Sequence, residues 1–230
     1  TGCTFSDFVS GQHDGAMLIF DTYSATSTAQ TVTLTGNTFN YGSGAAIYPA
    51  LIGAGSRINE SVTVTNNTFG VGYPTEKQYI LLSRGVGYSS NHRNAVWGET
   101  GIPYLLTSEI VVTGADADNL STLTIKPGVT VCLGDGEGSD NLTVRGSLTA
   151  EGTADKPITF TKKVGLEFGN EIAAGNNFKG NIVLKYCEMD GLFRAIGITA
   201  PGAAGTSILL ENCAVRNCQN PMYLAGLNVT

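Results

Sequence analysis

Several short segments of the chain alternate apolar and polar residues with a period of two. The clearest is Val-Thr-Leu-Thr-Gly-Asn-Thr-Phe at 32–39, which recurs as Val-Thr-Val-Thr-Asn-Asn-Thr-Phe at 62–69. Looser copies are Ile-Val-Leu-Lys-Tyr-Cys-Glu-Met at 182–189 and Ile-Leu-Leu-Glu-Asn-Cys-Ala-Val at 208–215. Alternation of this kind predicts strands that are buried on one face. A turn and a third apolar residue end each copy.

A second short apolar stretch accompanies the repeats, at 16–20, 45–48, 78–82, 195–199 and 221–225. Two or three short strands in each roughly 30-residue period leave no room for the helices of βαβ units. A single coil cannot bury its apolar face alone, so successive coils must stack. The repeats therefore predict an all-β parallel solenoid.

Stacking brings equivalent residues of neighbouring coils within about 4.8 Å of each other. Asn37 and Asn67 should then lie one above the other, with their side-chain amides hydrogen-bonded in a ladder. Cys187 and Cys213 occupy the same turn position, where we expect two stacked thiols that pack as small hydrophobic groups. A disulfide between these two cysteines is the alternative.

Three further segments carry a resemblance to a known family. They are Leu-Thr-Ile-Lys-Pro-Gly-Val-Thr-Val at 123–131, Leu-Thr-Val-Arg-Gly-Ser-Leu-Thr-Ala-Glu-Gly-Thr at 142–153, and Lys-Pro-Ile-Thr-Phe-Thr at 156–161. This run resembles the opening coils of right-handed parallel β-helix repeat proteins of the pectate-lyase-like type. The resemblance implies a right-handed parallel β-helix from a secreted or cell-surface protein, and it implies no particular activity.

Opening coils in mid-chain suggest two consecutive solenoid pieces. We expect residues 1–98 to hold the C-terminal part of a first β-helix plus a linker, and 99–230 to hold the first coils of a second. The linker is placed at 85–101, around Trp97. One continuous helix with a long insertion is the alternative. Neither end of the sequence has an evident polar cap, so we expect an excerpt of a longer chain or a unit that joins end to end.

Composition narrows the function classes. Only 14% of the residues are charged and 30 are glycine, which argues against a helical bundle, and 42% are hydrophobic, which argues against disorder. A net charge of -6 makes nucleic acid an unsuitable partner. No apolar run approaches the roughly 18 residues of a membrane span. Five cysteines are an odd number, and their spacing matches no metal-binding motif.

Polysaccharide lyases and hydrolases of this fold stack carboxylates along an outward strand face, whereas the repeats here place no acidic ladder there. Glu188 and Asp190 follow one turn, and Arg216 stands one coil later. We expect a surface ion pair between Asp190 and Arg216, and these three residues are the weak candidates for ligand binding.

Asp135, Glu137 and Asp140 lie in a Gly-rich loop whose oxygen atoms suit Ca²⁺, the one cofactor that the sequence suggests. The loop lacks the full calcium-binding pattern, so a solvated turn is the favoured interpretation. Asp116, Asp118 and Asn119 form a still weaker candidate. His13 and His92 are interpreted as loop residues, because neither has a partner at the spacing of a catalytic triad.

These observations together predict a non-enzymatic, extracellular structural or adhesive β-helical segment of a larger surface protein or filament. Its expected partners are neighbouring copies or flanking coils of the same protein. The alternative is a module that binds or degrades polysaccharides, with glycans as its ligands.

Overall fold

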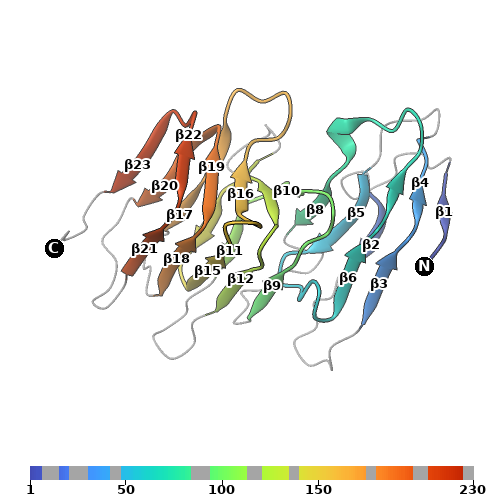
Figure 1. Cartoon of the computed structure of the whole chain (residues 1–230), viewed down its shortest axis with the longest axis horizontal. Helices are drawn as coiled ribbons and strands as arrows, with labels where there is room; N and C mark the ends of the chain where they lie inside the picture. Colours follow the sequence, from blue (N-terminus) through green and yellow to red (C-terminus); the bar gives the residue numbers. More distant parts are fainter. Residues whose placement is uncertain are drawn as a thin grey trace.

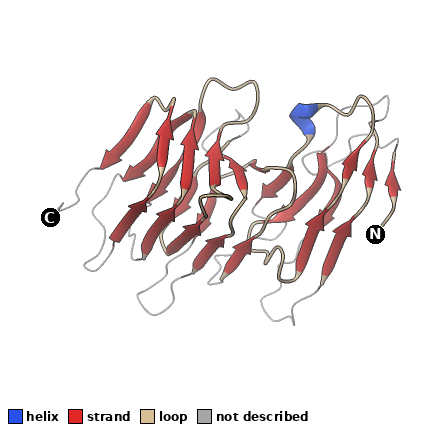
Figure 2. Ribbon diagram, in the orientation of Figure 1, coloured by secondary structure: helices blue, strands red, loops and turns tan. Residues whose placement is uncertain are grey.

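The structure, a computed structural model, describes residues 1–6, 16–20, 31–41, 48–83, 94–112, 121–134, 140–174, 180–198 and 207–224. These residues form short strands and one short helix, η1 (Thr75–Lys77), as Figure 2 shows. All strand pairs among them are parallel. The chain is a parallel β-solenoid, and no helix in the described part has the length and hydropathy of a membrane span.

One sheet of eight strands runs along the molecule, and we call it the central sheet. Its strands, in order, are β2 (Ala16–Phe20), β5 (Tyr48–Gly53), β8 (Ile80–Ser83), β10 (Tyr104–Leu106), β13 (Thr130–Cys132), β16 (Ile158–Thr161), β19 (Cys187–Asp190) and β22 (Ala214–Arg216). In Figure 1 the coils follow one another along the longest axis of the molecule from β1 to β23. This sheet is the common wall of all the coils.

From β9 onward, each coil visits three sheets in the same order. It begins in the second sheet, made of β9 (Ala95–Trp97), β12 (Thr122–Ile125), β15 (Ser147–Glu151), β18 (Asn181–Lys185) and β21 (Ser207–Glu211). It then enters the central sheet. It ends in the third sheet, made of β11 (Ile110–Val112), β14 (Leu142–Val144), β17 (Gly169–Ala174), β20 (Leu192–Ile198) and β23 (Asn220–Leu224).

The coils before β9 are built differently. They begin in a two-stranded sheet of β3 (Val32–Thr35) and β6 (Val62–Thr65) and continue in a three-stranded sheet of β1 (Thr4–Phe5), β4 (Thr38–Phe39) and β7 (Thr68–Phe69). The central sheet is thus the last wall of these coils and the middle wall of the later ones. One stretch expected at 45–48 is strand β5, which begins only at Tyr48.

Inward side chains of successive coils form apolar columns. Val131, Phe160 and Met189 are register partners on neighbouring strands of the central sheet, and all three are fully buried. The alternating residues of the same strands, such as Thr159, point outward. One continuous cluster of buried side chains extends from Leu34 to Ile198. The period-two pattern therefore produces a single core along the axis.

The boundary predicted at residues 98/99 lies beside the change in coil type. The central sheet crosses it, because β8 pairs with β10. The linker expected at 85–101 includes β9, which pairs with β12, and the indole of Trp97 is fully buried with its Nε1 donating to Ala54 O at 3.1 Å. Trp97 is thus a core residue. The division into two solenoids stays a prediction.

The middle of the central sheet is also buried on its outward face. Leu51, Leu81, Leu105 and Cys132 point outward there and are nonetheless covered. The connection 162–168 folds back over this face, where Val164 N donates to the Tyr79 hydroxyl at 3.4 Å. The period-two pattern is absent where both faces of a strand are packed.

Candidate functional site

A tight corner joins the first and second strands of several coils. Its first residue has a left-handed backbone, with φ of 66° at Gly36, 53° at Asn66, 48° at Tyr186 and 53° at Asn212. Gly and Asn adopt this conformation at the lowest cost, which explains three of the four residues. The residue after it points into the coil. The inward residues at these corners are Asn37, Asn67, Cys187 and Cys213.

Asn37 and Asn67 lie on adjacent coils and are directly hydrogen-bonded. Asn67 Oδ1 accepts from both the backbone N and the Nδ2 of Asn37, each at 3.0 Å. Asn67 Nδ2 donates to Leu34 O at 2.8 Å. Cys3 holds the same position one coil earlier, and its backbone N donates to Asn37 Oδ1 at 3.0 Å. The two amides therefore form a ladder along the axis.

Cys187 and Cys213 occupy successive rungs of the equivalent column. Cys213 Sγ donates to Leu184 O at 3.3 Å, and Cys187 Sγ donates to Ala150 O at 3.4 Å. Leu184 and Ala150 are register partners, so both thiols make the bond that Asn67 makes to Leu34 O. All five cysteines lie in the described part and are free thiols, without a disulfide between Cys187 and Cys213.

The sequence interpretation assigned no role to two further corner cysteines. Cys3 belongs to the asparagine column, and Cys218 lies at the next corner of the last described coil, with its Sγ 3.8 Å from Met189 O. Asn217 precedes Cys218 with a left-handed φ of 51°. The Asn-Cys pairs at 212–213 and 217–218 were the available signal, since each combines a left-handed residue with an inward one.

Thiol labelling should distinguish the buried cysteines from Cys3. Burial raises the pKa of both Cys132 and Cys187 from the usual 9.0 to about 12, with a smaller contribution from the nearby Cys213 in the second case. Both thiols are therefore protonated at pH 8, where only thiolates react. We expect iodoacetamide to modify Cys132 and Cys187 at least about 100-fold more slowly than the exposed Cys3, as measured by mass spectrometry. Equal labelling in native buffer, with uniform labelling in urea as the control, would contradict this burial.

The structure pairs the candidate ligand residues differently from the sequence prediction. Arg216 is the register partner of Asp190, but its guanidinium lies 3.7 Å from Glu188 Oε1. Asp190 Oδ1 instead accepts a hydrogen bond from Asn217 Nδ2 at 2.7 Å. The expected Asp190–Arg216 ion pair is thus replaced by a diagonal Glu188–Arg216 pair, because the corner residue Asn217 engages Asp190.

Most of the calcium candidates fall outside the described residues. These are Asp135, Glu137, Asp116, Asp118 and Asn119, and the same holds for His13 and His92. Asp140 is described, and its side chain is buried just before β14. Within the described ranges, no group of three or more His, Cys, Asp or Glu side chains is arranged to hold a metal ion.

Outward ion pairs also connect the later coils in the second and third sheets. Lys185 lies between Glu151 and Glu211, with Nζ–O distances of 3.0 and 3.8 Å. The hydrogen bond to Glu151 and the two carboxylates raise the pKa of Lys185. Glu171 and Arg194, in the third sheet, form a more buried pair at 3.3 Å. Opposite charges one coil apart slightly favour this stacking register, and the sequence could not show the pairs before the register was known.

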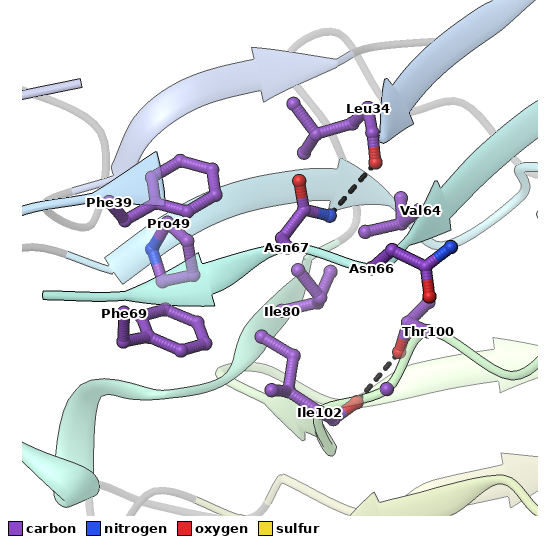
Figure 3. A pocket seen from close by; sticks show the side chains of 11 residues that line it. Leu34, Phe39, Pro49, Val64, Asn66, Asn67, Phe69, Ile80, Thr100 and Ile102 are labelled. Atoms are coloured by element: carbon purple, nitrogen blue, oxygen red, sulfur yellow. Dashed lines mark hydrogen bonds between the residues drawn. The ribbon is translucent and has the colours of Figure 1, made fainter. Parts of the chain in front are cut away.

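A cavity of about 260 Å³ lies where the asparagine ladder ends, beside the connection between β9 and β10 (Figure 3). Leu34, Val64 and Ile80 form apolar walls, and Asn66 and Asn67 line it together with Thr100. Nothing in the sequence pattern predicted it, because it arises where two kinds of coil meet.

Comparisons of the chain with protein-family models, with curated proteins and with solved structures found no match.

Proposed function

We propose that the chain is a structural or adhesive rod segment of a larger extracellular protein or filament, and not an enzyme. The observation that carries the proposal is the continuity of its inward columns from coil to coil. Buried register partners such as Phe160 and Met189 repeat at the strand spacing along the central sheet from β5 to β19. Such a core extends by adding coils, which is the way that solenoids build length.

The last described coil leaves part of this core exposed. Val215 stacks on Met189 and is 37% exposed, whereas Met189 is fully buried. Met222 stacks on Ile196 and is 41% exposed, whereas Ile196 is fully buried. These inward residues continue the apolar columns onto strands β21 to β23 at the edge of their sheets, and we propose that a further coil packs on them. We call Ile208, Leu210, Val215 and Met222 the coil-end surface.

Charged residues border the coil-end surface and indicate which charges a partner coil should carry. Glu211 continues the row Glu151–Lys185 and Arg216 continues from Glu188, so the next coil would best place a cation at the first position and an anion at the second. The proposed occupant is a coil of a neighbouring copy of the protein.

Charged substitutions in the coil-end surface should prevent end-to-end association. Val215→Lys with Met222→Lys would place two ammonium groups in an apolar interface, and we expect the association constant to fall at least about tenfold. Both side chains are already partly exposed, so the monomer should remain folded. Sedimentation velocity over a concentration series measures the association, and small-angle scattering measures the particle length.

Leu209→Lys is the matched control, because Leu209 lies on the same coil but points outward. It should associate as the unchanged protein does. A compact particle, or monomers at all concentrations for the unchanged chain, would contradict the rod assembly.

The alternative of a polysaccharide-active module depends on Glu188 and Asp190. Their pairing with Arg216 and Asn217 favours the structural role, since both carboxylates are engaged within the protein. Turnover of pectin or alginate that is lost in Glu188→Gln would favour the enzyme instead.

A further inference from the structure

The asparagine ladder has a direction. The backbone N–H of each rung donates to the side-chain oxygen of the rung on the following coil: Cys3 N donates to Asn37 Oδ1, and Asn37 N donates to Asn67 Oδ1, both at 3.0 Å. The backbone N–H of Asn67 therefore points toward the next coil, where a further amide oxygen would continue the ladder.

Among the described residues of the next coil, none provides such an oxygen. The corner of that coil is replaced by the longer connection between β9 and β10, in which the Thr100 hydroxyl donates to Ile102 O at 2.6 Å within the same connection. Among the described residues, none provides an acceptor for the Asn67 backbone N–H. The ladder thus ends, within the described part of the chain, on a donor that lies at the wall of the 260 Å³ cavity and has no protein acceptor.

The residues that line the cavity are all uncharged and mostly apolar, which indicates the class of ligand. Leu34, Val64, Ile80 and Phe69 are apolar, and no residue that lines the cavity carries an ionisable side chain. Asn66 and Gly101 line the cavity and are solvent-exposed, so they form its mouth. In Figure 3 the amide of Asn67 lies beside these apolar side chains. Ligand sites generally combine such apolar walls with a few directed polar groups.

We infer that this cavity binds a small neutral molecule with an apolar ring or branched body and a carboxamide or carbonyl group. The ligand oxygen takes the place of the missing Asn Oδ1 and accepts from the Asn67 backbone N–H, and the apolar body fills the space between Val64 and Ile80. The volume exceeds the roughly 150 Å³ that admits benzene in an engineered protein core. A charged ligand is excluded, because nothing in the wall compensates its charge.

The test is an NMR titration of the isotope-labelled protein with benzamide, isopropylbenzene and benzoate. These probes share an aromatic ring and differ in the polar group. We expect benzamide to bind saturably, at least about fivefold more tightly than isopropylbenzene, and to shift the Asn67 backbone amide resonance downfield. Benzoate should not bind. Saturable binding of benzamide should also give contacts to the methyl groups of Val64 and Ile80.

Two matched substitutions on β6 test whether benzamide binds in this cavity. Val64→Phe fills it, so we expect a folded protein whose affinity for benzamide falls at least about tenfold. Val62→Phe makes the same change at a buried position that does not line the cavity, and it should lower Tm by several degrees. If Val64→Phe does not fold, the methyl contacts in the unchanged protein still locate the ligand.

Three results would overturn the inference: no saturable binding of benzamide, equal affinity for benzamide and isopropylbenzene, or binding without contacts to Val64 and Ile80. Occupation by water alone would give the first result.

Discussion

Phe160→Ala is expected to destabilise the protein by about 3–5 kcal/mol, a large part of the net stability of a typical domain. Phe160 is fully buried in the middle of the column that includes Val131 and Met189. Removing the ring leaves a cavity that neighbouring strands cannot close, because backbone hydrogen bonds fix the spacing between coils on both sides. Urea unfolding followed by circular dichroism gives the free energy of unfolding.

Thr159→Ala is the control on the same strand. Thr159 points outward and is only half-buried, so we expect a loss below about 1 kcal/mol. A comparable loss for both variants would show that the inward column does not dominate stability. A change in the slope of the urea transition would indicate that individual coils unfold separately, as repeat proteins can.

Asn37→Ala is expected to cost about 2–3 kcal/mol, because it breaks the ladder at a residue that is only 1% exposed. The Cys3 backbone N–H loses its acceptor, and Asn67 Oδ1 loses one of its two donors. Asn67 is half-buried, so water replaces its lost donor only in part, whereas Cys3 is exposed and its N–H can turn to water. Thermal and urea unfolding measure the effect.

Asn66→Gly is the matched control at the same corner. Gly2 and Gly36 hold this left-handed position on the two preceding coils, so glycine is compatible with the backbone there. We expect a change below about 0.5 kcal/mol. The free energy of unfolding should fall less for Asn37→Cys than for Asn37→Ala, since cysteine fills the equivalent position at Cys187 and Cys213. Equal stability of Asn37→Ala and the unchanged protein would mean that the ladder follows from the stacking and contributes nothing to it.

The repeat in the sequence was sufficient to predict the parallel solenoid and the strands that carry it. Period-two alternation at 32–35 and 62–65 matches β3 and β6, and their register places Thr35 on Thr65. The stacking of Asn37 on Asn67 follows from the same repeat. The local sequence pattern predicts these strands and their stacking correctly, because one face of each strand is buried and the coils are similar in length.

The partners of the candidate site residues and the burial of Trp97 could not be predicted from the sequence. Arg216 pairs with Glu188 because Asn217 engages Asp190, and this choice depends on side-chain geometry at a corner. Trp97 was assigned to a linker because glycine and polar residues surround it, although β9 is buried on pairing with β12. Short strands without alternation offer no local signal of their burial.

The amino-acid sequence alone determined that this chain stacks coils, where the repeated strands lie, and which residues of those strands and corners face inward. Each of these depends on the residue itself and on neighbours a few positions away. The tertiary structure decided how the two kinds of coil join, which outward residues of the central sheet are covered, and that a cavity interrupts the ladder after Asn67. Those features depend on contacts between residues far apart in sequence. A local pattern indicated a boundary near residue 98 but contains no information about which side chains meet there.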